Sequence, residues 1–378
     1  MSKAAQLAAL IGSGQAQGNK NLIINGDMQI FQRATAATAA NNSYATVDRW
    51  AFGESTDGAY TSEQSTDTPT GTGFSVKAQV TTADTSIAAA QYAYIYQNIE
   101  AQNLQSLQYG TSSAKTLTVS FFVKSNKTGT YTFTIYKQDA TSYIIPIEYT
   151  ISSANTWEKK TITISPTAGS TSFITASAGA IANDNGLGFQ IAFGLAWGSN
   201  FHGTNNTWSS NSNHYGTSNQ VNWMDSTSNN FYLSQVQLEI GETATPFEHR
   251  SFADELHSCK RFYQKSFVYS QPPVNSSNTT SNSYNGAMGG YCGSNNSGIY
   301  SGGIQLDPPM RATPTMTTYG NSNGHWGYLS PTNTGTVTYS AGGGYVGHIR
   351  ENGFSIGQNI GSNTLYIGFG QWTAEAEL

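Results

Sequence analysis

Charged residues are scarce in this sequence. They make up 10% of the 378 residues, against roughly 25% in an ordinary globular chain. The net charge is only -5, and no basic patch is visible. We therefore expect no nucleic-acid partner, because such a partner needs a positively charged face. No apolar run approaches the roughly 18 residues of a membrane-spanning helix, so we also expect no membrane insertion.

Cysteine is rare as well. Cys259 and Cys292 are the two cysteines, which is too few for a disulfide framework in a chain of this length. We expect both to be free thiols in a protein that is assembled in a reducing cytoplasm. Residues 1–11 do not match a signal peptide, because Gln6 interrupts the apolar part and Lys3 is the one basic residue.

Motifs of common catalytic and metal sites are missing. The sequence has no Gly-x-Ser-x-Gly, no glycine-rich phosphate loop before a lysine, and no His-Glu-x-x-His. His249 and His257 lie near Cys259, but their spacing matches no metal site. Glu239 and Glu248 would form a glycosidase pair only if the fold set them at the right separation. We expect a protein that is not an enzyme and holds no cofactor or metal, with glycan hydrolysis as the minor alternative.

The sequence is rich in turn residues and tyrosine, with 39 glycines and 22 tyrosines. Alternating apolar and polar segments between such turns predict β-strands. The strands predicted for a first domain are residues 21–32, 47–52, 73–80, 92–99, 117–124, 129–137, 143–151, 157–164, 188–196 and 231–240. Those predicted near the C-terminus are residues 313–319, 336–340, 345–350 and 364–370. The spacing indicates an all-β fold, an antiparallel jelly-roll β-sandwich followed by a smaller β domain.

We expect four parts in the chain. Residues 1–18 form a short N-terminal helix and docking segment, and residues 19–250 form the jelly-roll β-sandwich. Residues 251–263 form a short connecting helix, and residues 264–378 form the C-terminal β domain. The first part follows from an apolar stripe that a helix of ten residues cannot keep ordered alone in water. We expect this stripe to dock on another copy or on a platform of the assembly through Leu7, Leu10 and Ile11.

The stretch of residues 231–263 joins the two domains. Its first part alternates, and we expect one face of a strand to carry Tyr232, Val236, Leu238 and Ile240. Its second part has helical spacing, and we expect one helical face to carry Phe252, Leu256, Cys259 and Tyr263. Ser251, three residues before Asp254, is the expected N-cap of this helix.

A long loop interrupts the regular spacing of strands. Residues 198–227 carry several aromatic residues among Asn, Ser, Thr and Gly, and inserts of this length are uncommon unless they have a function. We expect Trp208 and Tyr215 to contact a ligand, with His214 as a polar partner, because they lie mid-loop. Trp197 and Trp223 at the loop ends are expected to be buried anchors. The alternative is that the loop is a structural cover over the sandwich.

Several motifs resemble those of bacteriophage tail-fibre and related virion fibre proteins, of the type found in phages of cyanobacteria and other aquatic bacteria. They are NLIINGDMQI at residues 21–30, DRW at 48–50, FYLSQVQLEIG at 231–241, PFEHR at 246–250, CKRFY at 259–263, MRATPT at 310–315 and QWTAEAEL at 371–378. The resemblance covers nearly the whole chain, and its motifs are structural ones.

The first domain also resembles the jelly roll of carbohydrate-binding modules. Such modules often hold a structural calcium ion near the first and last strands, where this chain has Asn25, Gly26 and Asp27. Gln235 stands where an acid is usual in the last strand, which leaves fewer charged oxygen ligands than Ca²⁺ prefers. We therefore expect no metal here.

The resemblance implies a non-enzymatic virion fibre, assembled in the host cytoplasm, that attaches a phage to the host surface by binding a glycan. It further implies a homotrimer that contacts other tail or capsid proteins of the virion. The alternative is a capsid fibre, decoration or adaptor protein with a purely structural role.

Overall fold

The computed structural model describes residues 20–42, 44–69, 71, 73–275, 287–288, 290–292, 299–301, 303–319, 327–329, 338–339, 345–358, 367–369 and 371–378. The chain divides into two compact units, residues 1–31, 35–255 and 378 in the first and residues 32–34 and 256–377 in the second. The predicted N-terminal helix, with Leu7, Leu10 and Ile11, lies outside the described residues. None of the described helices is long and apolar enough to span a membrane.

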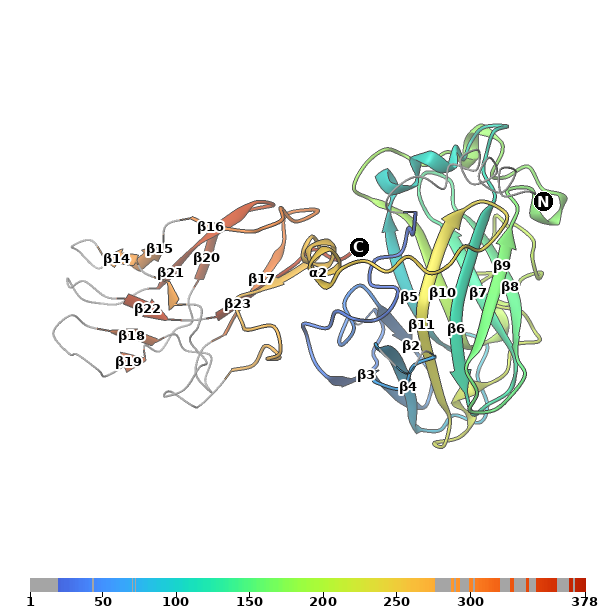
Figure 1. The fold of residues 1–378 in the computed structure, drawn as a ribbon, viewed down its shortest axis with the longest axis horizontal. Helices are drawn as coiled ribbons and strands as arrows, with labels where there is room; N and C mark the ends of the chain where they lie inside the picture. The colour runs from blue at the N-terminus through green and yellow to red at the C-terminus, as the bar shows by residue number, and fades with distance from the viewer. Residues whose placement is uncertain are drawn as a thin grey trace. The chain divides into compact units, whose positions relative to one another are not determined.

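The first unit is a sandwich of two antiparallel sheets (Figure 1). The six-stranded sheet has the order β1 (Ala36–Thr38), β3 (Ala59–Ser65), β4 (Ser75–Thr82), β11 (Asn230–Ile240), β6 (Leu117–Ser125) and β9 (Glu158–Ile164). The five-stranded sheet has the order β2 (Ala51–Glu54), β5 (Tyr92–Glu100), β10 (Leu187–Trp197), β7 (Gly129–Lys137) and β8 (Tyr143–Ile151). The predicted all-β, antiparallel sandwich is confirmed, as are the predicted strands from residue 73 to residue 240.

Phenylalanines from both sheets meet at the centre of the sandwich. Phe121 of β6 packs edge-on against Phe193 of β10, with ring centroids 4.9 Å apart, and Phe133 of β7 lies 5.2 Å from Phe193. All three side chains are fully buried. Such pairs contribute about 0.5–1.5 kcal/mol beyond the burial of their area. The period-2 alternation that predicted these strands is therefore the alternation of core and outer faces.

A bulge in β11 changes which side chains share a face. The register with β6 shifts between Ser234 and Gln237, and Gln235 has a φ of +51°. Before the shift Leu233 is buried, and after it Val236 is buried. Tyr232 therefore points outward, and the prediction that it shares a face with Val236 was wrong. A bulge reverses the alternation because its extra residue moves the strand by one position.

The strands predicted at residues 21–32 and 47–52 do not form as expected. Residues 21–32 contain no strand, and β2 begins only at Ala51. Asn25, Met28 and Arg49 have φ values of +58°, +60° and +71°, which lie outside the range of regular strand backbone. The backbone of this segment bonds to side chains instead: Asn25 Nδ2 donates to the carbonyls of Ile30 and Asp48, at 2.8 and 2.9 Å. The strand prediction for residues 21–32 was therefore wrong.

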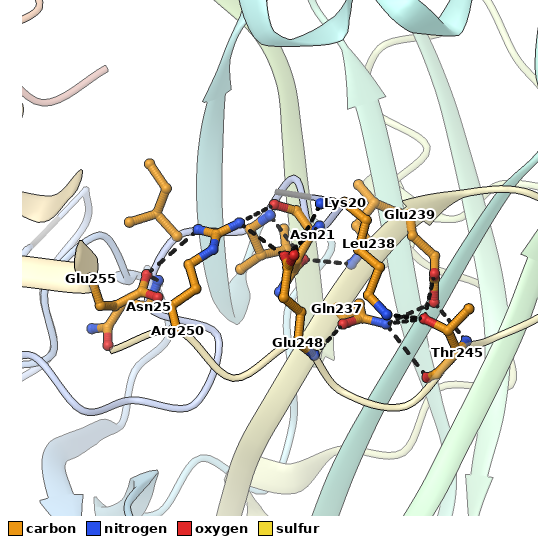
Figure 2. A network of polar contacts seen from close by, with 12 residues as sticks. Lys20, Asn21, Asn25, Gln237, Leu238, Glu239, Thr245, Glu248, Arg250 and Glu255 are labelled. Carbon is orange, nitrogen blue, oxygen red and sulfur yellow. Dashed lines mark hydrogen bonds and ion pairs between the residues drawn. The ribbon is translucent and has the colours of Figure 1, made fainter. Parts of the chain in front are cut away.

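A polar network joins this segment to β11 and to residues 245–255 (Figure 2). Asn21 Oδ1 accepts from the Leu238 amide at 3.0 Å, and its Nδ2 donates to the Val236 carbonyl at 3.1 Å. The Glu248 carboxylate accepts from the backbone amides of Lys20 and Asn21, at 3.2 and 3.0 Å. Three of the motifs that resemble those of fibre proteins, at residues 21–30, 231–241 and 246–250, thus bond to one another in this network.

Two glutamates in this network have opposite pKa shifts. Burial by itself raises the pKa of Glu248, but the backbone amide of Asn21 and the nearby Arg250 outweigh it and lower the pKa below its ordinary value. Burial raises the pKa of Glu255, and this effect is larger than the lowering effect of the Asn25 amide and of Arg250. We call Glu248, together with Lys20, Asn21 and Arg250, the Glu248 clasp.

The connecting helix is shorter than predicted. α2 spans Phe252–Lys260, and Ser251 caps it as expected, since its Oγ accepts from the Asp254 amide at 3.2 Å. The Cys259 side chain is buried. Phe252 is 46% exposed, and Tyr263 starts β12 (Tyr263–Lys265). Phe252 and Cys259 lie within the helix at the predicted spacing, whereas Tyr263 is not on the predicted helical face because the helix ends at Lys260.

The second unit is built from short antiparallel strands. Its described core contains Leu306, Met310, Phe354, Trp372 and Ala374. The predictions for residues 313–319, 336–340, 345–350 and 364–370 each contain an observed strand, whereas β12 to β16, β18, β21 and β23 were not predicted. The strands are β13 (Ala287–Met288), β14 (Gly290–Cys292), β15 (Ile299–Ser301), β16 (Ile304–Gln305), β17 (Thr315–Tyr319), β18 (Gly327–Leu329), β19 (Thr338–Tyr339), β20 (Tyr345–Arg350), β21 (Gly353–Gln358), β22 (Ile367–Phe369) and β23 (Gln371–Glu375).

Candidate functional site

Aromatic side chains gather on the outer face of the five-stranded sheet. Ala93 and Ile95 of β5 face the core, so the alternate residues of this strand face away from it. The rings that meet there form what we call the outer aromatic cluster, which consists of Tyr44, Tyr92, Tyr94, Tyr96, Trp197, Phe201 and Tyr215.

Four of these rings form one continuous stack. Tyr96 stacks on Tyr94 with centroids 5.2 Å apart, Tyr94 stacks on Trp197 at 5.0 Å, and Trp197 stacks on Tyr215 at 5.3 Å. Interplanar angles of 30°, 30° and 29° make all three contacts near-parallel. Tyr92 adds an edge-on contact to Tyr94 at 5.5 Å. The stack therefore crosses from β5 to β10 and into the loop that follows.

Two glycines leave room for this stack. A Cβ on Gly194 of β10 would lie 2.1 Å from Trp197 Nε1, and a Cβ on Gly53 of β2 would lie 2.1 Å from a ring carbon of Tyr94. The indole N–H of Trp197 donates to Thr132 Oγ1 at 3.0 Å. The rings thus lie directly on the backbone of the sheet, and any larger residue at either glycine would displace them.

The long loop after β10 covers the other half of this face. Thr134 of β7 donates to the carbonyl of Tyr215 at 2.5 Å, and Thr217 donates to Glu148 of β8 at 2.6 Å. Ser209 exchanges two backbone hydrogen bonds with Ile144, of 2.9 and 2.8 Å, along the edge of β8. These bonds hold the loop against the five-stranded sheet.

Trp208 is not where the sequence placed it. Its side chain is 1% exposed, its indole N–H donates to the Ser165 carbonyl at 2.9 Å, and its ring meets Tyr109 edge-on at 6.5 Å. The expectation that a mid-loop position leaves the ring exposed was wrong, because the loop folds back onto the sandwich. Trp208 belongs to the core and lies in a different cluster from Tyr215.

The other predicted loop residues lie at the surface or anchor the loop. His214 is half-buried, and its Nδ1 and Nε2 lie 2.9 Å from Ser209 Oγ and from Asn211 Nδ2. Tyr215 is half-buried within the stack. Trp197 is 6% exposed and Trp223 is fully buried, so the prediction that both are anchors is confirmed.

Sequence reasoning missed the tyrosines of β5. Tyr92, Tyr94 and Tyr96 stand at every second position of a strand, which places three rings on one face. That signal was visible in the sequence, but their meeting with Trp197 depends on the pairing of β5 with β10.

The segments of chain that supply most of the cluster carry no charged residues. Between Asp184 and Asp225 the sequence has no Asp, Glu, Lys or Arg. Burial raises the pKa of Tyr94 and of Tyr215 well above the ordinary tyrosine value, which keeps both hydroxyls neutral. Beside the stack, Gln190 donates to Asn98 Oδ1 at 3.1 Å, and its Oε1 has no hydrogen-bond partner among the described residues. The face thus offers aromatic surface and neutral polar groups.

Asn25 and Asp27, the positions considered above for a calcium ion, make contacts within the chain. Asn25 holds the backbone of its own segment, and Asp27 accepts a hydrogen bond from Gln29. Across the described part of the chain, no group of three or more His, Cys, Asp or Glu side chains is placed to hold a metal ion.

No family model matches this sequence, and no curated protein matches it either. Several solved structures are similar to part of this chain. The enzymatically active domain of tailspike protein 4 from bacteriophage CBA120 is 12% identical over 59% of this chain, with a TM-score of 0.30, and this chain spans only 22% of its length. A family 11 carbohydrate-binding module of a Clostridium thermocellum cellulase is 14% identical over 55% of this chain and 96% of its own, with a TM-score of 0.27. The module TmCBM61, solved with β-1,4-galactotriose, is 9% identical over 58% and 99%, with a TM-score of 0.27. These likenesses concern the fold alone.

Proposed function

We propose that the first unit binds a neutral glycan at the outer aromatic cluster. The observation that carries this proposal is the continuous ring stack set in a stretch of chain without charged side chains. Tyr92, Phe201 and Tyr215 are half-buried, so each ring keeps an accessible part. The apolar face of a sugar ring packs on such aromatic surface, while amides such as Gln190 bond to sugar hydroxyls.

Residues 85–99 and 185–224, which supply six of the seven rings of the cluster, include no Lys or Arg, and this favours an uncharged glycan. A carboxylated or sulfated sugar would lose part of its hydration on binding, and it would find no cation there to compensate for that loss. Recognition would then rest on ring contact and neutral hydrogen bonds, so we expect weak dependence on salt.

We further propose that the chain is a virion fibre, in the phage tail, that attaches the particle to a host surface glycan. The motifs that resemble those of fibre proteins support this role. Two of them, at residues 21–30 and 246–250, are joined by the Glu248 clasp. A homotrimer would present three copies of the cluster, and avidity would raise weak single-site binding. Docking on other virion proteins through Leu7, Leu10 and Ile11 belongs to the same proposal.

Binding of the full-length chain to an array of neutral and acidic bacterial glycans tests the first part. We expect neutral glycans to be bound, and Tyr92→Ala and Tyr215→Ala to weaken the binding at a nearly unchanged melting temperature. Phe252→Ala is the matched control, because Phe252 is an exposed aromatic residue away from the cluster. Unaltered binding by both tyrosine variants would rule out the cluster as the site.

Immunogold labelling of intact virions tests the second part. Label at the tail, together with antibody inhibition of host adsorption, is the expected result. Label on the head, with adsorption unaffected by the antibody, would instead favour a capsid fibre, decoration or adaptor protein.

A further inference from the structure

The outer face of the six-stranded sheet carries a row of aligned side chains. Glu63 of β3 lies opposite Lys77 of β4, Lys77 opposite Tyr232 of β11, and Tyr232 opposite Lys124 of β6. Trp157, just before β9, ends the row beside Lys124. We call these five residues the cross-strand row. At about 4.8 Å between strands, the four paired positions from Glu63 to Lys124 extend over roughly 14 Å.

Two rings at one end of the row form a fixed platform. Tyr232 and Trp157 meet edge-on with centroids 6.1 Å apart. Lys124 Nζ lies 4.4 Å from the centroid of Tyr232 and 5.4 Å from that of Trp157. Asp67 completes the group, because it pairs with Lys124 and accepts the indole N–H of Trp157 at 2.9 Å. Both rings are half-buried, so the platform is held in place while part of it stays open.

The exposed charge of the row is negative. The side chains of Asp67 and Glu63 are 44% and 40% exposed, whereas those of Lys124 and Lys77 are 11% and 24% exposed. Each lysine is engaged by its own acid and lies beneath it. Burial by itself raises the pKa of Asp67, but hydrogen bonds from Lys124 and Trp157 outweigh it and lower the pKa. A ligand therefore meets two partly exposed carboxylates beside an aromatic surface.

We propose that the cross-strand row, with Asp67, is a second saccharide site, distinct from the outer aromatic cluster and on the opposite sheet. A neutral sugar stacks on Tyr232 and Trp157, and its hydroxyl groups donate to Asp67 and Glu63. Hydrogen bonds to carboxylates are stronger than those between neutral groups. An anionic polysaccharide is disfavoured because the lysines are already paired. A second copy of this chain is a poorer occupant, since no unpaired cation of the row would face the partner's acids.

Glycan-array binding by the full-length chain tests this site independently of the first one. We expect Trp157→Ala and Asp67→Asn each to lower apparent affinity for neutral glycans about tenfold, and Trp157→Phe, which keeps a ring, to lose less. Tyr92→Ala reports on the outer aromatic cluster in the same assay. The double variant Trp157→Ala/Tyr92→Ala should bind least.

Several outcomes would overturn the second site. If Trp157→Ala and Asp67→Asn both keep wild-type binding while Tyr92→Ala loses it, the row only stabilises the sheet, and the proposed function stands. Loss of self-association in Trp157→Ala, measured by sedimentation, would identify an interface between copies. Stronger binding to acidic than to neutral glycans would make the ligand class wrong. Should Trp157→Ala unfold, Asp67→Asn, which alters an exposed side chain, carries the test.

Discussion

The two outer faces of the sandwich differ in how their side chains are held. On the five-stranded sheet, rings lie on glycine backbone and a loop without charged residues lies over them. On the six-stranded sheet, ion pairs fix a row of long side chains, and the Glu248 clasp holds the segment that follows β11. Both sheets have the same alternation toward the core, so the difference between their outer faces comes from the residues and loops that cover them.

Because of this difference, we expect the two faces to respond differently to pH and salt. Aromatic packing and neutral hydrogen bonds depend little on pH or salt, whereas partly exposed carboxylate contacts weaken in acid and are screened by ions. Variants and conditions can therefore be chosen that act on one face and leave the other unchanged.

The largest loss of stability is expected from a substitution at a buried position of the loop of residues 198–227. Trp208→Ala removes a side chain that is 1% exposed and breaks its hydrogen bond to Ser165. Removing a buried tryptophan costs about 3–5 kcal/mol, so the melting temperature should fall clearly in thermal unfolding. Trp157→Ala, on the open face, is the matched control and should change the melting temperature little. Equal shifts for the two variants would contradict the difference in burial.

Substituting Gly194 should disturb the stack itself. Its Cβ would lie 2.1 Å from Trp197 Nε1, so Gly194→Ala must displace the indole and weaken its bond to Thr132. Overpacking of this kind costs about 1–3 kcal/mol. We expect reduced stability by chemical denaturation, a shifted tryptophan fluorescence maximum, and weaker glycan binding. Gly303→Ala is the control, because no residue that the structure describes lies within 4 Å of the added Cβ there. A normal fluorescence spectrum in Gly194→Ala would show that the stack tolerates the change.

These variants also show what the sequence could predict. The strands from residue 73 to residue 240 were predictable, because each has an alternation that a sandwich core requires. Residues 20–50 were not, since their partners are far away in the chain: Asn21 bonds to Val236. The burial of Trp208 and the outward turn of Tyr232 depend on a loop path and a bulge. The cross-strand row depends on strand register, which single segments do not specify.

We expect alkaline pH to change the stability of the protein through Lys137, a buried lysine of β7. The Lys137 side chain is fully buried, and its ammonium donates to the carbonyls of Asp139 and Thr141, at 2.5 and 2.9 Å. Burial lowers its pKa from 10.5 to about 8. The unfolded chain therefore binds more protons between these values, and stability should rise with pH from about 8 to 10.5, on the order of 1–2 kcal/mol.

The comparison between Lys137→Met and the wild type isolates this effect. Buried tyrosines lower stability above roughly pH 10 in both proteins, so they cancel in the difference. Denaturant titrations from pH 7.5 to 10.5 should show a rise in the wild type that Lys137→Met lacks. Lys159→Met, at an exposed position of β9, should keep it. A rise of the same size in Lys137→Met would assign the effect to another group.

The smallest effect on stability is expected from acid, which should weaken the Glu248 clasp beside the six-stranded sheet. The pKa of Glu248 is lowered from 4.5, so its contribution to stability is complete above that value and is lost as pH falls through the folded-state pKa. Glu248→Gln keeps one acceptor oxygen and should cost about 0.5–1 kcal/mol at pH 7. The difference from the wild type should shrink below pH 4, and high salt should also reduce it. Glu242→Gln, at an exposed carboxylate, is the control and should leave the acid limb of the stability curve unchanged. A difference between Glu248→Gln and the wild type that stays constant from pH 7 to pH 3 would mean that shape, and not charge, holds this segment on the sheet, and the contrast between the two faces would then lose its electrostatic part.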